Sequence, residues 1–242
     1  MKALRFAVLA LFAPCAALAN QTDDVEATGG SVIPSLGVSI DVVGRSSVRD
    51  HTPFSHAIDM GFAYAHATHK QDRDPGDQPV IFGGTTFLAA NGDIDWTSNV
   101  QFAHIGYRPR YWFGGSNFAL EGVIGVGWAG VGLKGQAGTL AATERFSATG
   151  LALGVGGIWR FLPATSLQLR YLGIYPGKKE GVTSAARFDL SVAHAIAKNL
   201  QVRGGLGLLG VYSAREDKDD NVVKSPVHAG GGGLFLGLDF TF

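Results

Sequence analysis

Cysteine is almost absent from this chain of 242 residues. Its single cysteine, Cys15, lies near the N-terminus and follows Pro14, where lipid attachment would require a small residue. If the leader that holds Cys15 is removed, the mature chain has no thiol. That excludes disulfide bonds, cysteine nucleophiles and cysteine-based metal sites.

Long apolar runs are absent as well. Lys2 and Arg5 precede a short apolar stretch, Phe6–Ala13, and a small-residue cleavage pattern follows at Ala17–Ala19. This order is typical of a secretory signal peptide, which we predict over residues 1–19. No segment has the roughly 20 consecutive apolar residues that a membrane-spanning helix needs. We therefore expect an exported chain without a helical anchor.

Neither charge sign is in excess, since Lys and Arg together number 20 and Asp and Glu also number 20. The chain has no basic surplus that would favour nucleic acid as a partner. Glycine is abundant instead, with 35 residues and no collagen-like period. Glycine weakens ordinary strands but suits narrow barrels, whose tightly curved walls leave little room for side chains.

Most of the chain alternates apolar and polar residues in segments separated by turns. Residues 20–34 are polar and contain Gly29 and Gly30, which predicts a short flexible N-terminal segment before one domain at 35–242. Alternation with a period of two predicts strands, and several segments have about the length that a tilted membrane strand needs. The clearest are 35–43, 56–66, 99–112, 117–128, 147–161, 166–175, 186–196, 200–212 and 228–242.

The connections between these segments differ in length from one end to the other. Tight turns are predicted at 114–116, 162–165 and 197–199. Long polar loops are expected at 129–145, 176–185 and 213–227. Outer-membrane β-barrels have short turns on the periplasmic side and long loops outside. With Phe242 in the periplasm, the segment 99–112 runs toward the periplasm and Asp93–Trp96 lies outside.

Nine clear strands give an odd total, whereas single-chain bacterial barrels have even numbers. One solution adds a strand at Val80–Ala90, joined to the next by a turn at Asn91-Gly92, which is a strong hairpin signal. The other is an eight-stranded barrel that begins at His56 and leaves 35–43 outside the wall. We favour ten strands because the apolar residues of 35–43 alternate regularly. The predicted fold is thus an all-β, antiparallel, up-and-down transmembrane β-barrel.

The two faces of these strands differ in composition. One face is almost entirely apolar, with Ile58, Leu120 and Leu153 among its members. The other carries charges near the strand centres, where an Arg or Lys facing hydrocarbon would cost about 2–4 kcal/mol. We therefore predict a charge network that lines the lumen, whose pairs would plug it if the lumen is narrow, with Arg203 as the partner of Asp239. Its members are Asp59, Arg108, Arg110, Glu121, Arg160, Arg170, Asp189, Arg203 and Asp239.

A soluble β-sandwich or lipocalin-like barrel would show the same alternation with the two faces exchanged. The placement of aromatic residues favours the membrane, because Tyr and Trp gather at both predicted ends, as in the interfacial belts of membrane barrels. The predicted girdle comprises Tyr107, Tyr111 and Trp159 at the periplasmic end and Trp128, Tyr171, Tyr175 and Tyr212 at the external end.

The segment Ile105–Tyr111 (IGYRPRY), the glycine-rich strands and the closing strand Leu234–Phe242 resemble those of small bacterial outer-membrane β-barrels. This group includes the outer-membrane-protein-A transmembrane domain and the opacity-type surface proteins, and the resemblance covers the mature chain as architecture. It implies an outer-membrane location, outer-membrane lipid as surroundings, and an assembly signal at Phe240 and Phe242 that the barrel-assembly machinery reads. Members of the group differ in role, so it implies no catalytic or binding residue.

Candidate residues for chemistry are few. His66 and His69 would point to opposite faces of a strand, which argues against a shared metal. Asp93 and Asp95 point the same way at an external strand tip, an arrangement like that of outer-membrane aspartyl proteases, and could activate water with a histidine from another loop. The residues that would complete such a site are not evident. No metal, cofactor or catalytic residue is predicted.

The sequence therefore predicts an outer-membrane barrel with a structural, adhesion or surface-interaction role, whose external loops bind a ligand. Two alternatives stay open. One is a narrow porin-like channel for small solutes, and the other is an outer-membrane hydrolase that uses Asp93 and Asp95.

Overall fold

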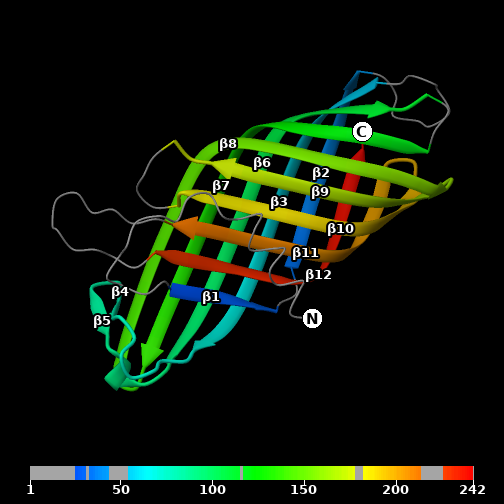
Figure 1. The fold of residues 1–242 in the computed structure, drawn as a ribbon. Coiled ribbons are helices and arrows are strands. Elements are labelled where there is room, and N and C mark those ends of the chain that lie inside the picture. The colour runs from blue at the N-terminus through cyan, green and yellow to red at the C-terminus, as the bar shows by residue number, and fades with distance from the viewer. Residues whose placement is uncertain are drawn as a thin grey trace.

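The computed structural model describes residues 25–30, 33–43, 54–114, 117–177, 182–213 and 226–241. The predicted signal peptide and Phe242 lie outside the described residues. The described part is all-β, as predicted, and most of it forms a closed barrel of nine strands with one further strand beside the ring (Figure 1).

The ring strands follow one another around the barrel in chain order. The nine ring strands are β2 (Ile33–Val43), β3 (Phe54–Gln71), β6 (Ile94–Trp112), β7 (Phe118–Ala137), β8 (Leu140–Leu162), β9 (Thr165–Tyr175), β10 (Ser184–Ala197), β11 (Leu200–Ser213) and β12 (Val227–Thr241). Outside the ring are β1 (Val25–Gly30), the hairpin strands β4 (Val80–Phe82) and β5 (Thr85–Phe87), and the short 3-10 helix η1 (Ala89–Asn91).

The barrel closes through a parallel pair of strands. Neighbouring ring strands pair antiparallel in chain order, but β2 and β12 run in the same direction, with Pro34 opposite Leu236 and Val38 opposite Phe240. The odd strand number is the reason, because each strand of a meander reverses direction and the first and ninth therefore agree. The predicted purely antiparallel arrangement is wrong at this seam.

The favoured ten-stranded barrel and the eight-stranded alternative are both wrong. The extra strand expected at Val80–Ala90 is instead the separate β4–β5 hairpin, turned by Gly83 and Gly84, whose φ angles of +55° and +75° suit glycine. Phe82 and Phe87 of this hairpin are fully buried against Trp96, with ring centroids 5.2 and 6.0 Å from that of the indole. The hairpin packs on the inner face of the barrel wall and does not add a strand to the ring. The eight-stranded alternative fails because β2 belongs to the ring.

One side of the barrel extends well beyond the other. Leu151 of β8 pairs with Tyr175, the last residue of β9, so residues 140–150 of β8 continue without a β9 partner. The long loop expected at 129–145 is wrong, because β7 and β8 remain paired up to the turn at Gly138. The β4–β5 hairpin lies at this extended end, at the lower left of Figure 1, whereas β12 ends at the opposite end.

The strand β1 lies on the inner side of the extended wall. It pairs parallel with β12, and the Ala27 carbonyl accepts a hydrogen bond of 3.0 Å from the buried Ser98 hydroxyl of β6. At Gly29 it passes so close to β3 that an added Cβ would lie 2.9 Å from the Thr68 carbonyl oxygen. Val25–Gly30, which lies in the segment predicted as flexible at 20–34, forms a strand paired with β12.

The interior is divided into an apolar part and a charged part. Along β6, the inward positions Trp96, Val100 and Phe102 belong to the buried apolar core, and the next ones are His104 and Arg108. The same order occurs on β12, where the buried Phe235 precedes the buried Asp239. Apolar side chains thus fill the extended end, and the charged side chains lie toward the end where β12 stops.

Candidate functional site

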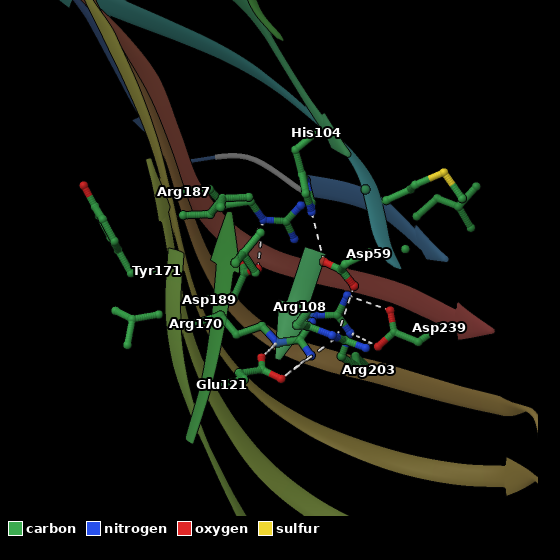
Figure 2. Close-up of a pocket in the computed structure, with 17 residues that line it drawn as sticks. Asp59, His104, Arg108, Glu121, Arg170, Tyr171, Arg187, Asp189, Arg203 and Asp239 are labelled. Carbon is green, nitrogen blue, oxygen red and sulfur yellow. Dashed lines mark hydrogen bonds and ion pairs between the residues drawn. The ribbon is translucent and has the colours of Figure 1, made fainter. Parts of the chain in front are cut away.

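The centre of the charged part is the carboxylate of Glu121, which is buried on β7. Arg170 of β9 approaches it with its Nε 2.5 Å from Oε1, and Arg110 of β6 with its Nη2 3.1 Å from Oε2. A third guanidinium, that of Arg108, lies 4.0 Å from Oε2. Figure 2 shows the side chains of Arg108 and Arg170 beside Glu121. The carboxylate thereby holds three strands of the wall together across the lumen.

Arg108 connects Glu121 to a second carboxylate. Its Nη1 lies 3.1 Å from Oδ1 of Asp59 on β3, and it also donates a hydrogen bond to the Ser39 hydroxyl of β2. The other oxygen of Asp59 lies 3.0 Å from Nε2 of His104. His104 has room because Gly61 faces it, where an added Cβ would lie 2.5 Å from the imidazole Cε1. Asp59 thus links β2, β3 and β6.

Two further ion pairs lie on the strands that lead to the seam. Arg203, the partner predicted for Asp239, has its Nε 2.6 Å from Oδ2 and donates a 2.9 Å hydrogen bond from Nη2 to Oδ1. Arg187 and Asp189 lie two residues apart on the inward face of β10, 2.8 Å from each other. The guanidinium groups of Arg187 and Arg203 lie 5.6 and 5.9 Å from the Phe235 ring centroid. These contacts fill the lumen beside the Glu121 cluster.

The cluster has more guanidinium groups than carboxylates. Arg108, Arg110, Arg170, Arg187 and Arg203 face Asp59, Glu121, Asp189 and Asp239, which leaves one excess positive charge when His104 is neutral. Among the described residues, Nε of Arg110, Nη2 of Arg187 and Nδ1 of His104 are buried without a hydrogen-bond partner. Arg187 and His104 line a cavity of about 50 Å³. That volume suits one or two water molecules, which would satisfy such donors.

Most of the predicted network residues come together, and two residues were missing from the prediction. Arg160 faces the lumen outside the cluster, where its guanidinium carbon lies 4.3 Å from the centroid of the Trp112 ring. Arg187 was omitted although it shares the parity of Asp189, so the alternation of β10 could have revealed it. His104 could not be oriented from the sequence, because the pattern around it is irregular, and its inward position depends on the pairing of β6 with β3.

The predicted girdle residues lie on the outer face. At the end where β12 stops, Tyr107, Tyr111 and Trp159 are 43%, 40% and 53% exposed. Toward the extended end, the hydroxyls of Tyr171 and Tyr175 are 3.3 Å apart, and the Tyr212 ring lies 4.8 Å from that of His228. Trp128 packs over Gly130 of its own strand. Phe240, of the predicted assembly signal, is half-buried on the outward parity of β12.

Asp93 and Asp95, the candidate catalytic pair, lie near the start of β6. Asp93 Oδ2 lies 2.7 Å from the Lys70 ammonium, and Oδ1 accepts a 3.0 Å hydrogen bond from the Arg73 backbone N–H. The hydrogen bond with Lys70 lowers the pKa of Asp93 and raises that of Lys70. Asp95 is exposed and pairs in register with Lys70. The Asp93 carboxylate is therefore a weak base that is already engaged.

Neither a metal site nor a membrane-spanning helix is present among the described residues. There, no three His, Cys, Asp or Glu side chains are grouped in a way that could hold a metal ion. His66 is exposed and has its Nδ1 2.8 Å from Asn99 Oδ1, whereas His69 pairs in register with Trp96. In the same part of the chain, no helix is long and apolar enough to cross a membrane.

Fold and site together define a closed nine-stranded β-barrel with an apolar outer face and an interior plugged by ion pairs. No protein-family model, curated protein or solved structure matches the chain.

Proposed function

We propose that this protein is an outer-membrane β-barrel with a plugged lumen and a structural or surface-interaction role. In this proposal the residues around the β7–β8 turn and the β4–β5 hairpin face the outside of the cell. They form the surface on which an external ligand binds. The signal peptide predicted at residues 1–19 supports export, and the resemblance of the closing strand to those of outer-membrane barrels supports the location.

The observation that carries the proposal is the distribution of apolar side chains. Large apolar residues on the outer face of all nine ring strands are exposed, while the buried charges face inward. Burying one such side chain is worth roughly 1.5–3 kcal/mol, and monomeric soluble proteins rarely expose so large an apolar patch. Members of this outer belt are Leu36, Ile58, Phe62, Ile105, Leu120, Ile124, Val126, Leu153, Val155, Leu169, Leu190, Val192, Leu206, Leu234 and Leu236. A lipid environment would cover it.

The height of the belt agrees with a membrane. On β7 the outward apolar residues run from Phe118 to Trp128, and the next outward side chain that is not glycine is Lys134. A strand rises about 3.3 Å per residue and tilts by about 40°, so this stretch spans about 25 Å along the barrel axis. The apolar band of known membrane barrels has about the same height.

The plugged interior supports a non-channel role over the porin-like alternative. Glu121 is surrounded by guanidinium groups in one half of the lumen, and Trp96, Phe102 and Phe235 fill the other half. The hydrolase alternative is less favoured, because Asp93 is engaged by Lys70 and by the Arg73 N–H. We propose no catalytic role.

Location and orientation can be tested together by labelling single cysteines. The only native cysteine, Cys15, lies in the predicted leader, so the mature background has no thiol. Thr86→Cys in the β4–β5 hairpin and Lys198→Cys in the β10–β11 turn are both exposed, at opposite ends of the barrel. On intact cells, a membrane-impermeant maleimide should label the first and not the second, whereas lysed cells should show both. Labelling of neither or only of Lys198→Cys on intact cells, or recovery in the soluble fraction, would contradict the proposal.

A further inference from the structure

A shallow apolar groove crosses the outer face near the external edge of the belt. It has a volume of about 440 Å³, within the range of small-molecule sites. Ala103 of β6 forms its floor, between its cross-strand neighbours Phe62 and Trp128. One cross-strand row nearer the end where β12 stops, Ile105 and Val126 form the wall of the groove on that side. The groove exists because the short side chain of Ala103 lies between the large side chains of Phe62 and Trp128 in one cross-strand row.

The strands change character immediately beyond the groove. Along β8, Thr149 borders it, and the outward residues that follow toward the β7–β8 turn are Ser147, Arg145 and Thr143. Along β7, Trp128 is followed on the same face by two glycines and then Lys134. The groove therefore lies at the border between the apolar belt and a polar surface. This is the depth at which a membrane lipid changes from acyl chain to headgroup.

Two cations lie on that polar surface with neutral neighbours. Arg145 pairs in register with Gly132, and an added Cβ at this glycine would lie 3.8 Å from the Arg145 Cγ, so the arginine stem covers the glycine. Lys134 lies one row further, opposite Thr143 and Thr97. Within the described residues, neither Arg145 nor Lys134 forms an ion pair. The next outward carboxylate in register, Asp95, lies one row beyond Lys134 and opposite Lys70, whose ammonium forms its ion pair with Asp93.

From this arrangement we infer that the groove binds a single membrane lipid whose headgroup carries a phosphate. One acyl chain lies on Ala103 between Phe62 and Trp128, and the phosphate meets Arg145 and Lys134. The row spacing agrees, since Arg145 lies four residues beyond Thr149, about 13 Å along the strand, and both cationic side chains are long enough to reach back toward the headgroup. The inference rests on the proposed membrane location.

The indole of Trp128 is a built-in probe of the site. The intact protein and a Trp128→Phe variant are refolded into phosphatidylcholine vesicles in which a minor fraction of lipid carries brominated acyl chains. This fraction is either phosphatidylglycerol or phosphatidylcholine, and the difference between the two proteins isolates the Trp128 fluorescence. We expect brominated phosphatidylglycerol to be enriched at Trp128 over brominated phosphatidylcholine by about fivefold for each cation.

Matched variants separate the headgroup contact from the groove. Replacing Arg145 and Lys134 together by Gln should abolish the enrichment, whereas Lys198→Gln at the opposite end should leave it unchanged. Ala103→Phe, which fills the groove, should also lower it, and Val192→Phe elsewhere on the belt should not. Both replaced cations are exposed surface residues, so the folded barrel is expected to persist.

Three other results of these quenching and crosslinking experiments would each contradict a different part of the inference. Equal quenching by the two brominated lipids in the intact protein would overturn the lipid site while leaving the membrane location intact. Absence of quenching by either lipid would overturn the location itself. Chemical crosslinking between two copies through a cysteine at Ala103, together with weak quenching, would assign the groove to a second copy and overturn the inference.

Discussion

The carboxylate of Glu121 on β7 lies 2.5 Å from the Nε of Arg170 on β9, although β8 separates these two strands in the sheet. The contact is made across the curved interior and not along the ladder of backbone hydrogen bonds. Curvature thus brings a carboxylate from one strand to guanidinium groups from two others, which ties the wall together from inside.

Replacing Glu121 by Gln should strongly destabilise the barrel. The guanidinium groups of Arg170 and Arg110 would remain buried without their anion, and removal of one partner from a buried ion pair costs about 3–5 kcal/mol. Urea unfolding of the protein in lipid vesicles measures this loss. Asp95→Asn, at an exposed position, provides the control and should change the unfolding free energy by less than about 0.5 kcal/mol. A loss below about 1 kcal/mol for Glu121→Gln would show that the cluster contributes little to stability.

The intact barrel should show no steady ion conductance in planar bilayers. Arg108→Ala removes the side chain that connects Asp59 with Glu121, and this variant should stay closed as well, because the apolar core around Trp96 and Phe102 fills the other half. Single-channel recordings of both proteins provide the measurement. Steady openings in the intact protein would favour the porin-like alternative, and openings in the variant alone would identify the charge network as the only barrier.

Replacing Gly37 by Val should weaken the parallel seam. Gly37 of β2 faces Asp239 of β12, and an added Cβ would collide with the Oδ1 that Arg203 binds. Overpacking costs about 1–3 kcal/mol, and displacement of a buried ion pair adds to it. The temperature at which the folded band is lost on a semi-native gel should fall. Gly177→Ala, where an added Cβ meets no atom within 4 Å, should leave that temperature unchanged. Equal behaviour of the two variants would contradict the role of Gly37.

The ion pair between Lys70 and Asp93 should make the structural order of the extended end dependent on pH. The hydrogen bond with Lys70 lowers the pKa of Asp93. The contribution of the Asp93 carboxylate to stability is therefore complete above its unfolded pKa of about 3.9, and it is lost as the pH falls through the lower folded pKa. The pKa of Lys70 is raised by the same hydrogen bond, so its contribution is complete below about 10.4 and is lost as the pH rises through the folded pKa.

Hydrogen exchange at the Arg73 amide reports on this pair directly, because that N–H donates to Asp93. After correction for the intrinsic exchange rate, protection of the Arg73 amide should be constant between the unfolded pKa of Asp93, about 3.9, and that of Lys70, about 10.4. It should fall in strong acid. In Asp93→Asn the acid-dependent change should disappear. An acid-dependent loss of protection that persists in the variant would assign the effect to other groups.

For most strand residues, the sequence was enough to predict whether the side chain lies on the outer or the inner face, because strand periodicity is a local property. Successive side chains of a strand point to opposite faces, so the apolar parity of β7 and the inward parity of Glu121 follow from spacing alone. The pairing of Arg203 with Asp239 could also be anticipated, because consecutive strands of a barrel are neighbours. Arg187 was within reach of the same reasoning, since it shares the inward parity of Asp189.

Other features depend on contacts between distant segments. The nine-stranded ring and its parallel seam result from β2 meeting β12, about 200 residues away. The position of the β4–β5 hairpin depends on the burial of Phe82 and Phe87 against Trp96. The inward position of His104 follows from register and from the space that Gly61 leaves. Alternation by itself thus determined which side chains share a face. Only the tertiary structure decided how many strands close the barrel and which charges meet, because closure and packing are set by long-range contacts that leave no periodic mark in the sequence.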